Sequence, residues 1–348
     1  MQLESALRGR YDLTLFTLHR GGESMATAAR DGPLAVSPGV APGGLVRAGL
    51  ALRGRVRAFR PDVVVAHGGD PLRAAVLAGL HRIAPLVCLR VSSVPSELRT
   101  PVRLRTLDFA YRRVAAFVAV SESLRRELIE DFGIPPARVR VIRNGRRILP
   151  PLTDDERSAI RRELGIAADE PMVAWMGRLV PEKDPLAAVA LAARLDSLMP
   201  AARVVLIGDG PMKARVLADA TRTPRLVLPG TRADGPRLVA AADLLVSTSR
   251  TEGAPGVLVE ALVAGVPVVA TDVGGVRDVV EPGESGLLTS PGDPEALPAA
   301  VAGLLGDDAE RTRMSARARV SGERFDIARV SDEYDALYQQ LLARRPRA

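Results

Sequence analysis

Cysteine and histidine are scarce in this chain of 348 residues, and each scarcity excludes a class of protein or site. The single cysteine, Cys88, excludes a disulfide-stabilised scaffold and a thiolate zinc site, and it is typical of a reducing compartment. The three histidines, His19, His67 and His81, lack metal-ligand spacing, and neither an HExxH nor a DxD pattern occurs. We therefore expect neither a metal centre nor any other built-in cofactor.

Long apolar runs are missing, and aromatic residues are few. No run reaches the roughly 18 apolar residues that span a bilayer, and the first residues lack the apolar core of a signal peptide. We expect a cytoplasmic protein, at most peripheral at the inner membrane face. The sequence pI is 10.3, but aromatics make up only 3% of residues and do not interleave with basic runs, so we do not expect nucleic acid as a partner.

Positive charge is concentrated in the first half of the chain. Residues 1–150 contain 24 arginines and 12 acidic residues, a net charge of +12, and the remainder carries −5. This asymmetry suggests that the first half faces an anionic acceptor or an anionic membrane leaflet. The alternative is a basic face that is merely solvated.

The hydrophobic pattern predicts two α/β domains. With 47% hydrophobic and 26% charged residues, a chain of this length folds best around two cores. Short, β-branched apolar runs alternate with helical stretches, which indicates two parallel sheets. The predicted strands are 62–66, 86–89, 117–120 and 139–142 in the first sheet, and 172–176, 203–207, 225–228, 244–247 and 267–270 in the second.

Helix signals lie between and after these strands. Ser121 is placed to cap a helix that stops before Gly133, a polar helix is expected over 153–164, and the pattern is helical from 294 to the end. The pairs Asn144-Gly145 and Pro150-Pro151 mark a linker. Ligands of such domains bind beyond the carboxyl ends of the strands, in the cleft that we expect between the two sheets.

Two cations follow the first strand of the second sheet. Arg178 and Lys183 lie in its exit loop, where both could stabilise the charge that grows on a departing diphosphate. The next strand leads into Gly208-Asp209-Gly210, whose glycines would let the backbone approach a ligand. Taken alone, the two charges could equally be solvated and the glycines could form a simple turn. Neither GxGxxG nor GxxxxGK[ST] occurs, so a dinucleotide enzyme and a P-loop enzyme are not supported.

The stretch 251–267 carries the strongest signal. It reads as a strand end, a Gly-rich loop and a helix, with Glu252 in the loop and Glu260 in the first turns of the helix. Amides of residues 256–258 are expected to point free N–H groups at an anion such as phosphate. Carboxylates accept hydrogen bonds from hydroxyls, as a nucleotide sugar would present. The spacing of the two glutamates alone also fits charges on a helix surface.

Together these segments resemble glycosyltransferase family 4, whose members have the GT-B fold. The resemblance rests on GRLVPEKDP, IGDGP, AADLLVSTSRTEGAPGVLVEALVAGVPVVATDVGG and VAVSESLRRELIEDFGIPPARVRVIRNG, and Glu252 and Glu260 reproduce the E-x7-E motif. It implies two Rossmann-like domains with parallel sheets facing across a cleft, plus C-terminal helices. The implied divisions are an acceptor-side domain at 1–145, a nucleotide-sugar-binding domain at 146–320, and a C-terminal helix at 321–348 that packs back on the first domain.

The resemblance also implies a function. It points to retaining transfer of a hexosyl unit from a UDP- or GDP-sugar to a hydroxyl acceptor, in cell-envelope polysaccharide, glycolipid or small-glycoside synthesis. Arg178, Lys183 and Glu252 match the catalytic positions, and Glu260 matches the glutamate that holds ribose hydroxyls. The other donor-binding positions are Gly177, Gly208, Gly210, Arg232, Gly253, Ala254, Pro255, Gly256, Val257 and Leu258.

The chain departs from the family pattern at three places. Residues 2–7 already look like the helix that follows the first strand and Gly-rich loop, so we expect that strand and loop to be absent through a misassigned start, a truncation or a loss. On the acceptor side, His67 matches a frequent histidine, whereas Arg90 replaces another; an arginine cannot act as a base but could bind an anion or form an ion pair. Arg147 replaces the usual acidic residue after Asn144-Gly145.

Two alternatives remain open. One is a non-catalytic nucleotide-sugar-binding or scaffold protein, which the apparent loss of the first loop favours. The other is a GT-B enzyme that isomerises or phosphorolyses sugars, which fits the pairing of E-x7-E with the Arg178 and Lys183 loop less well.

Overall fold

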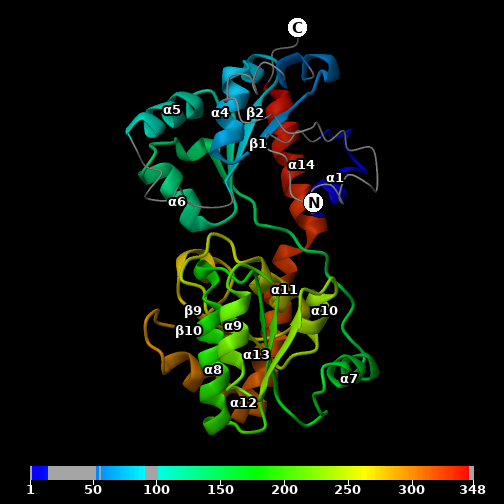
Figure 1. Cartoon of the computed structure of the whole chain (residues 1–348). Coiled ribbons are helices and arrows are strands. Elements are labelled where there is room, and N and C mark those ends of the chain that lie inside the picture. The colour runs from blue at the N-terminus through cyan, green and yellow to red at the C-terminus, as the bar shows by residue number, and fades with distance from the viewer. Residues whose placement is uncertain (1, 15–51, 55, 91–100, 345–348) are drawn as a thin grey trace. The chain divides into compact units, whose positions relative to one another are not determined.

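The chain folds into two compact units (Figure 1). A computed structural model describes residues 2–14, 52–54, 56–90 and 101–344. Unit 1 comprises residues 1–145 and 327–348, and unit 2 comprises residues 146–326. The Gly-rich stretch 39–45, whose composition predicts a loop, lies outside the described residues. Within the described part, no helix is both long and apolar enough to cross a membrane.

Unit 1 contains a four-stranded parallel sheet. Its strands are β1 (Val64–His67), β2 (Leu86–Arg90), β3 (Ala116–Ala119) and β4 (Val139–Val141), in the order β1-β2-β3-β4. Ala66, Cys88, Phe117 and Val139 stand side by side across all four strands, and each is at most 5% exposed. The four predicted strands and their parallel arrangement are confirmed.

Helices connect the strands of unit 1. They are α4 (Gly69–Leu77), α5 (Pro101–Tyr111) and α6 (Glu122–Glu130), with short 3-10 turns at Leu80–Arg82 and Pro136–Arg138. The predicted start of α6 is confirmed, because Ser121 Oγ accepts a hydrogen bond of 3.2 Å from the Leu124 amide. Helix α14 (Ile327–Ala343) packs against α1 (Gln2–Leu7). The Tyr11 and Tyr338 rings meet edge to face at 5.7 Å beside this contact.

Unit 2 contains a six-stranded parallel sheet. The strands are β5 (Met172–Met176), β6 (Arg203–Ile207), β7 (Leu226–Gly230), β8 (Leu244–Ser247), β9 (Val268–Thr271) and β10 (Gly286–Thr289), in the order β10-β9-β8-β5-β6-β7. The second parallel sheet is confirmed, but the edge strand β10 was not predicted. It has four residues, begins at a glycine and shows no apolar alternation, so no hydrophobic pattern marks it as a strand.

Helices cover both faces of this sheet. They are α7 (Asp154–Glu163), α8 (Pro185–Leu198), α9 (Lys213–Ala220), α10 (Gly235–Ala240), α11 (Gly256–Ala264), α12 (Ala296–Gly306) and α13 (Asp308–Gly322), with 3-10 turns η4 (Pro181–Lys183), η5 (Gly274–Asp278) and η6 (Glu323–Phe325). Val173 and Trp175 pack into the core formed with α8 and α12, whereas Met172 and Ala174 pack into the core formed with α11. Burial on both sides explains why the strands read as continuous apolar runs.

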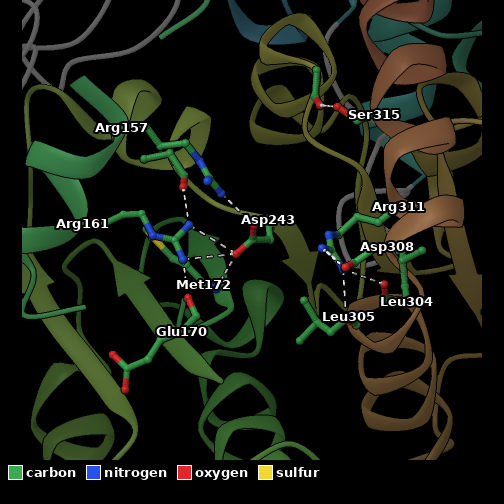
Figure 2. Close-up of polar contacts among 12 residues, drawn as sticks. Arg157, Arg161, Glu170, Met172, Asp243, Leu304, Leu305, Asp308, Arg311 and Ser315 are labelled. Carbon is green, nitrogen blue, oxygen red and sulfur yellow. Dashed lines mark hydrogen bonds and ion pairs between the residues drawn. The ribbon is translucent and has the colours of Figure 1, made fainter. Parts of the chain in front are cut away.

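A buried ion-pair cluster anchors α7 to the sheet (Figure 2). Arg161, only 3% exposed, reaches the Asp243 carboxylate at 3.3 Å, and Arg157 reaches the same carboxylate at 2.7 Å. Asp243 also accepts a 2.7 Å hydrogen bond from the Met172 amide at the start of β5. At the other end of α7, Thr153 and Glu156 cap the helix reciprocally.

The strand order places two loops at one point of the sheet. The chain runs outward from β5 through β6 to β7 and then returns to the other side of β5 to form β8. The loops after β5 and β8 therefore leave the sheet in different directions from adjacent strands. Such a switch of strand order is where open α/β sheets bind ligands.

Candidate functional site

The exit loop of β5 is held against the loop after β6. Gly177 and Leu179 donate backbone hydrogen bonds to Ile207 and Asp209, at 3.0 and 2.9 Å. A Cβ on Gly208, whose φ is +145°, would lie 1.9 Å from the Gly177 carbonyl oxygen. A Cβ on Gly210 would lie 2.6 Å from the Leu179 carbonyl oxygen. Both glycines therefore allow the two loops to approach each other.

Lys183 and Glu252 meet at the junction of β5 and β8. Lys183, at the end of η4, forms an ion pair with Glu252 Oε1, and Ser249 Oγ donates a 2.6 Å hydrogen bond to the same oxygen. The Glu252 side chain is 6% exposed and that of Lys183 is 31% exposed. Burying a carboxylate is costly unless donors replace water, and here the Lys183 ammonium and the Ser249 hydroxyl are those donors.

The loop after β9 contacts the backbone of Glu252. The Gly275 amide donates to the Glu252 carbonyl at 2.9 Å, and a Cβ on Gly274 would lie 2.0 Å from that oxygen. Thr271 Oγ1 donates to the Ser249 carbonyl at 2.6 Å. Sequence reasoning missed Ser249, Thr271 and this glycine pair as parts of the site, although the glycines stand within the DVGG segment of the resemblance.

Arg178 lies on the exposed part of the β5 loop. Its guanidinium makes no hydrogen bond or ion pair within the described part of the chain. The structure thus brings together Lys183 and Glu252, while Arg178, in the same loop, forms no hydrogen bond or ion pair with either one.

The first turn of α11 offers two backbone donors. The amides of Gly256 and Val257 have no hydrogen-bond acceptor among the described residues, and the preceding Pro255 supplies no side-chain cap. The amide of Leu258 donates to the Pro255 carbonyl at 3.1 Å. The expectation of three free amides at 256–258 is therefore corrected to two. An anion is favoured at such a helix terminus.

Glu260 lies one turn further along α11 and pairs with Arg146. Arg146 Nε donates to Glu260 Oε1 at 2.9 Å, and the two side chains are 24% and 20% exposed. Burial raises the pKa of Glu260 above its ordinary value, and the Arg146 guanidinium opposes that shift. Arg146 was not among the predicted site residues, because no local pattern links residues 114 positions apart.

Arg232 is engaged in ion pairs within unit 2. Its guanidinium binds Asp234 through two hydrogen bonds of 2.8 Å and Glu163 of α7 through one of 2.7 Å. These carboxylates raise the pKa of Arg232. The side chain therefore connects the loop after β7 to α7.

The two predicted acceptor-side residues lie at neighbouring strand ends in unit 1. His67 ends β1 and is exposed, whereas Arg90 ends β2, is 5% exposed and donates to the Tyr111 hydroxyl at 3.0 Å. The Gly68 amide donates to the Leu89 carbonyl at 2.9 Å and holds the two ends together. Burial raises the pKa of Tyr111 to about 12, so its hydroxyl stays protonated at neutral pH.

No three His, Cys, Asp or Glu side chains gather into a potential metal site within residues 2–14, 52–54, 56–90 and 101–344. The structure pairs Lys183 with Glu252 and Arg146 with Glu260 in unit 2; together with the amides of Gly256 and Val257, these groups suit an anionic, hydroxyl-rich ligand.

Sequence comparison identifies relatives that cover most of the chain. The profile of "Glycosyl transferases group 1" matches residues 156–321, and that of "Glycosyltransferase Family 4" matches residues 1–147. A 2-deoxystreptamine N-acetyl-D-glucosaminyltransferase of Streptomyces fradiae is 31% identical over 76% of this chain and 67% of its own length. A GDP-mannose-dependent alpha-mannosyltransferase of Mycobacterium tuberculosis is 32% identical over 83% and 76%. A D-inositol 3-phosphate glycosyltransferase of Thermobispora bispora is 32% identical, and the match spans 65% of its length.

Solved structures share the fold. Anabaena HepE in complex with UDP superimposes with a TM-score of 0.86 at 24% identity, covering 98% of this chain and 95% of that one. The sucrose-phosphate synthase of Thermosynechococcus elongatus superimposes with a TM-score of 0.78 at 20% identity, covering 99% and 92%. With the two parallel-sheet units and the Lys183 and Glu252 pair at the switch of strand order, these matches lead to one conclusion. The chain belongs to glycosyltransferase family 4 and has the GT-B fold.

Proposed function

We propose that this glycosyltransferase moves a hexosyl unit from a UDP- or GDP-sugar to a hydroxyl acceptor with retention of configuration. The observation that carries the proposal is the meeting of Lys183 and Glu252 beside the strand-order switch of unit 2. One residue supplies positive charge for a diphosphate, and the other supplies a carboxylate for sugar hydroxyls.

The chemistry follows from these charges. The bond between the anomeric carbon and the diphosphate oxygen breaks with its electron pair moving to the phosphate. Arg178, Lys183 and the free amides of α11 stabilise that charge as it develops. The acceptor oxygen bonds to the anomeric carbon on the face that the phosphate leaves, and its proton passes to the departing phosphate oxygen. Because protein groups carry the charge, we expect transfer to continue in the presence of EDTA.

Relatives support the donor and acceptor classes. One relative is named for GDP-mannose, and HepE was crystallised with UDP and with UDP-glucose. Two relatives are named for 2-deoxystreptamine and for D-inositol 3-phosphate, which are polyhydroxylated six-membered carbon rings. A small ring polyol is therefore the first acceptor to test, ahead of glycolipid and polysaccharide acceptors.

A transfer assay tests the proposal. The purified chain is incubated with UDP- and GDP-sugars and a panel of ring polyols, products are separated by mass spectrometry, and the anomeric configuration is read by NMR. We expect Lys183→Ala, Glu252→Ala and Arg178→Ala each to lower transfer at least tenfold, since each removes a charge from the reacting groups. Lys213→Ala is the matched control. Lys213 is the only other lysine of the sequence, and it forms an exposed ion pair with Asp209.

Each other outcome has a definite meaning. Full transfer by all three variants would overturn the assignment of these residues. Binding of a nucleotide sugar without transfer to any acceptor would favour the non-catalytic alternative. Release of an altered free sugar without an acceptor would favour the isomerising or phosphorolysing alternative.

A further inference from the structure

Arg146 is the first residue of unit 2, and its side chain contacts the helix that carries Glu260. Its amide donates to the Phe325 carbonyl at 2.7 Å, and its backbone forms an isolated parallel bridge with Asp326. The Arg146 backbone is therefore anchored next to the last residues of the unit.

The side chain of Arg146 lies along the first turn of α11. Its Nε donates to Glu260 Oε1 at 2.9 Å. A Cβ on Gly256 would lie only 2.2 Å from Arg146 Nη2, so the absence of a side chain at residue 256 makes room for the guanidinium. Gly256 and Glu260 are four residues apart and share one face of the helix. The guanidinium thus has one defined place, between these two positions.

We propose that Arg146 is a positioning residue that orients the Glu260 carboxylate toward the ribose hydroxyls of the donor nucleotide. The inference rests on the proposed function, in which Glu260 binds ribose. Oε1 is occupied by Arg146, while no hydrogen bond to Oε2 is formed within the described residues. One oxygen is therefore held by the protein, and the other is left to accept from a hydroxyl.

The charge of Arg146 serves the same purpose. Burial favours the protonated form of Glu260 and raises its pKa, while Arg146 favours the ionised form. Removing the guanidinium removes the opposing influence, so the pKa of Glu260 rises further. If ribose binding needs the ionised carboxylate, nucleotide affinity is lost as the pH is lowered. A variant without the Arg146 guanidinium then loses affinity at a higher pH than the unaltered protein.

Binding of paired nucleotides tests the inference. Calorimetry measures the dissociation constants of UDP and 2′-deoxy-UDP, and of GDP and 2′-deoxy-GDP, between pH 5 and pH 8. The unaltered chain is expected to prefer the ribose form about tenfold, as a hydrogen bond to a charged group commonly provides. Glu260→Gln and Arg146→Met are both expected to reduce that preference toward one. Arg146→Met should also move the acid-side loss of UDP or GDP affinity to higher pH.

Two further variants separate positioning from a structural role. Arg147→Met removes an arginine at the adjacent exposed position and should keep both the ribose preference and the pH profile. Arg146→Lys keeps the charge but not the Nε donor, so it should restore the pH profile and recover only part of the preference. If Arg146→Met keeps the ribose preference and pH profile while Glu260→Gln loses the preference, the inference is overturned and the proposed function stands. If the unaltered chain binds no nucleoside diphosphate, the proposed function fails and the inference with it.

Discussion

At the scale of single residues, each glutamate of the E-x7-E motif depends on a partner from another segment. Glu252 receives Lys183 from the β5 loop and Ser249 from the end of β8, whereas Glu260 receives Arg146 from the start of unit 2. A buried or half-buried carboxylate without donors would be protonated or displaced toward solvent. The partners therefore decide how the two carboxylates of the motif are held and oriented.

The contribution of Ser249 can be measured directly. Ser249→Ala removes a 2.6 Å hydrogen bond from a buried charged acceptor, which costs about 1–3 kcal/mol. If Glu252 acts at the transition state, the transfer rate should fall roughly tenfold, because each 1.36 kcal/mol corresponds to a factor of ten. The measurement is kcat with saturating donor.

Ser197→Ala is the control for this change, since the Ser197 hydroxyl bonds only an exposed carbonyl on α8. Equal kcat values for Ser249→Ala and the unaltered chain would show that Lys183 alone suffices to hold Glu252.

At the scale of elements, helix α7 is attached to the sheet by charge. Its Arg157 and Arg161 converge on Asp243, which lies before β8 and also bonds the first amide of β5. This cluster lies at the amino ends of the strands, whereas Lys183 and Glu252 lie beyond the carboxyl ends. The same sheet thus carries a structural ion-pair network at the amino ends of its strands and the candidate site beyond their carboxyl ends.

Removal of the central carboxylate should destabilise unit 2. Asp243→Ala leaves the guanidinium of Arg161, which is 3% exposed, without its counter-charge, and we expect a loss of about 3 kcal/mol in the free energy of unfolding. Urea denaturation followed by circular dichroism measures the change. Asp169→Ala, at an exposed position close to the cluster, should change stability by less than about 0.5 kcal/mol. Similar unfolding midpoints for both variants would show that the network contributes little to stability.

At the scale of the whole molecule, the half of the chain with net positive charge differs from the half that contains the candidate donor-site residues. The basic stretch 1–150 includes most of unit 1, and the acidic remainder includes most of unit 2, which contains all the candidate donor-site residues. An excess of positive charge attracts anionic surfaces at long range, and salt weakens this attraction.

We accordingly expect the chain to bind vesicles containing anionic lipid and not purely zwitterionic vesicles. Binding should weaken as salt rises, because the screening length shortens from roughly 30 Å at 0.01 M to about 10 Å at 0.1 M. Cosedimentation over this range of salt measures the effect. Binding that is absent, or that does not respond to salt, would leave the basic half with a solvated face or an anionic acceptor as its explanation.

The sequence by itself was sufficient to predict both parallel sheets and nine of their strands. Nonpolar, β-branched runs such as 172–176 and 203–207 match β5 and β6 because strands buried on both faces leave a local signature. Helix α6 was equally readable, since the cap and the hydrophobic stripe lie within a few residues of each other. The edge strand β10 had no such signature, because half-exposed short strands depend on their neighbour for definition.

In the candidate site, too, local patterns were readable from the sequence and long-range contacts were not. The sequence alone placed Lys183 and Glu252 in loops that follow strands and Glu260 in the first turns of a helix, because strand ends and helix starts follow from local patterns; their binding of a ligand stays a prediction. Only the tertiary structure decided which groups hold them: Arg146 on Glu260, Ser249 on Glu252, and Gly208 against Gly177. Most of these contacts join segments that are brought together only when the sheet orders its strands. Their energies depend on distance in space, and no pattern along the chain encodes that distance.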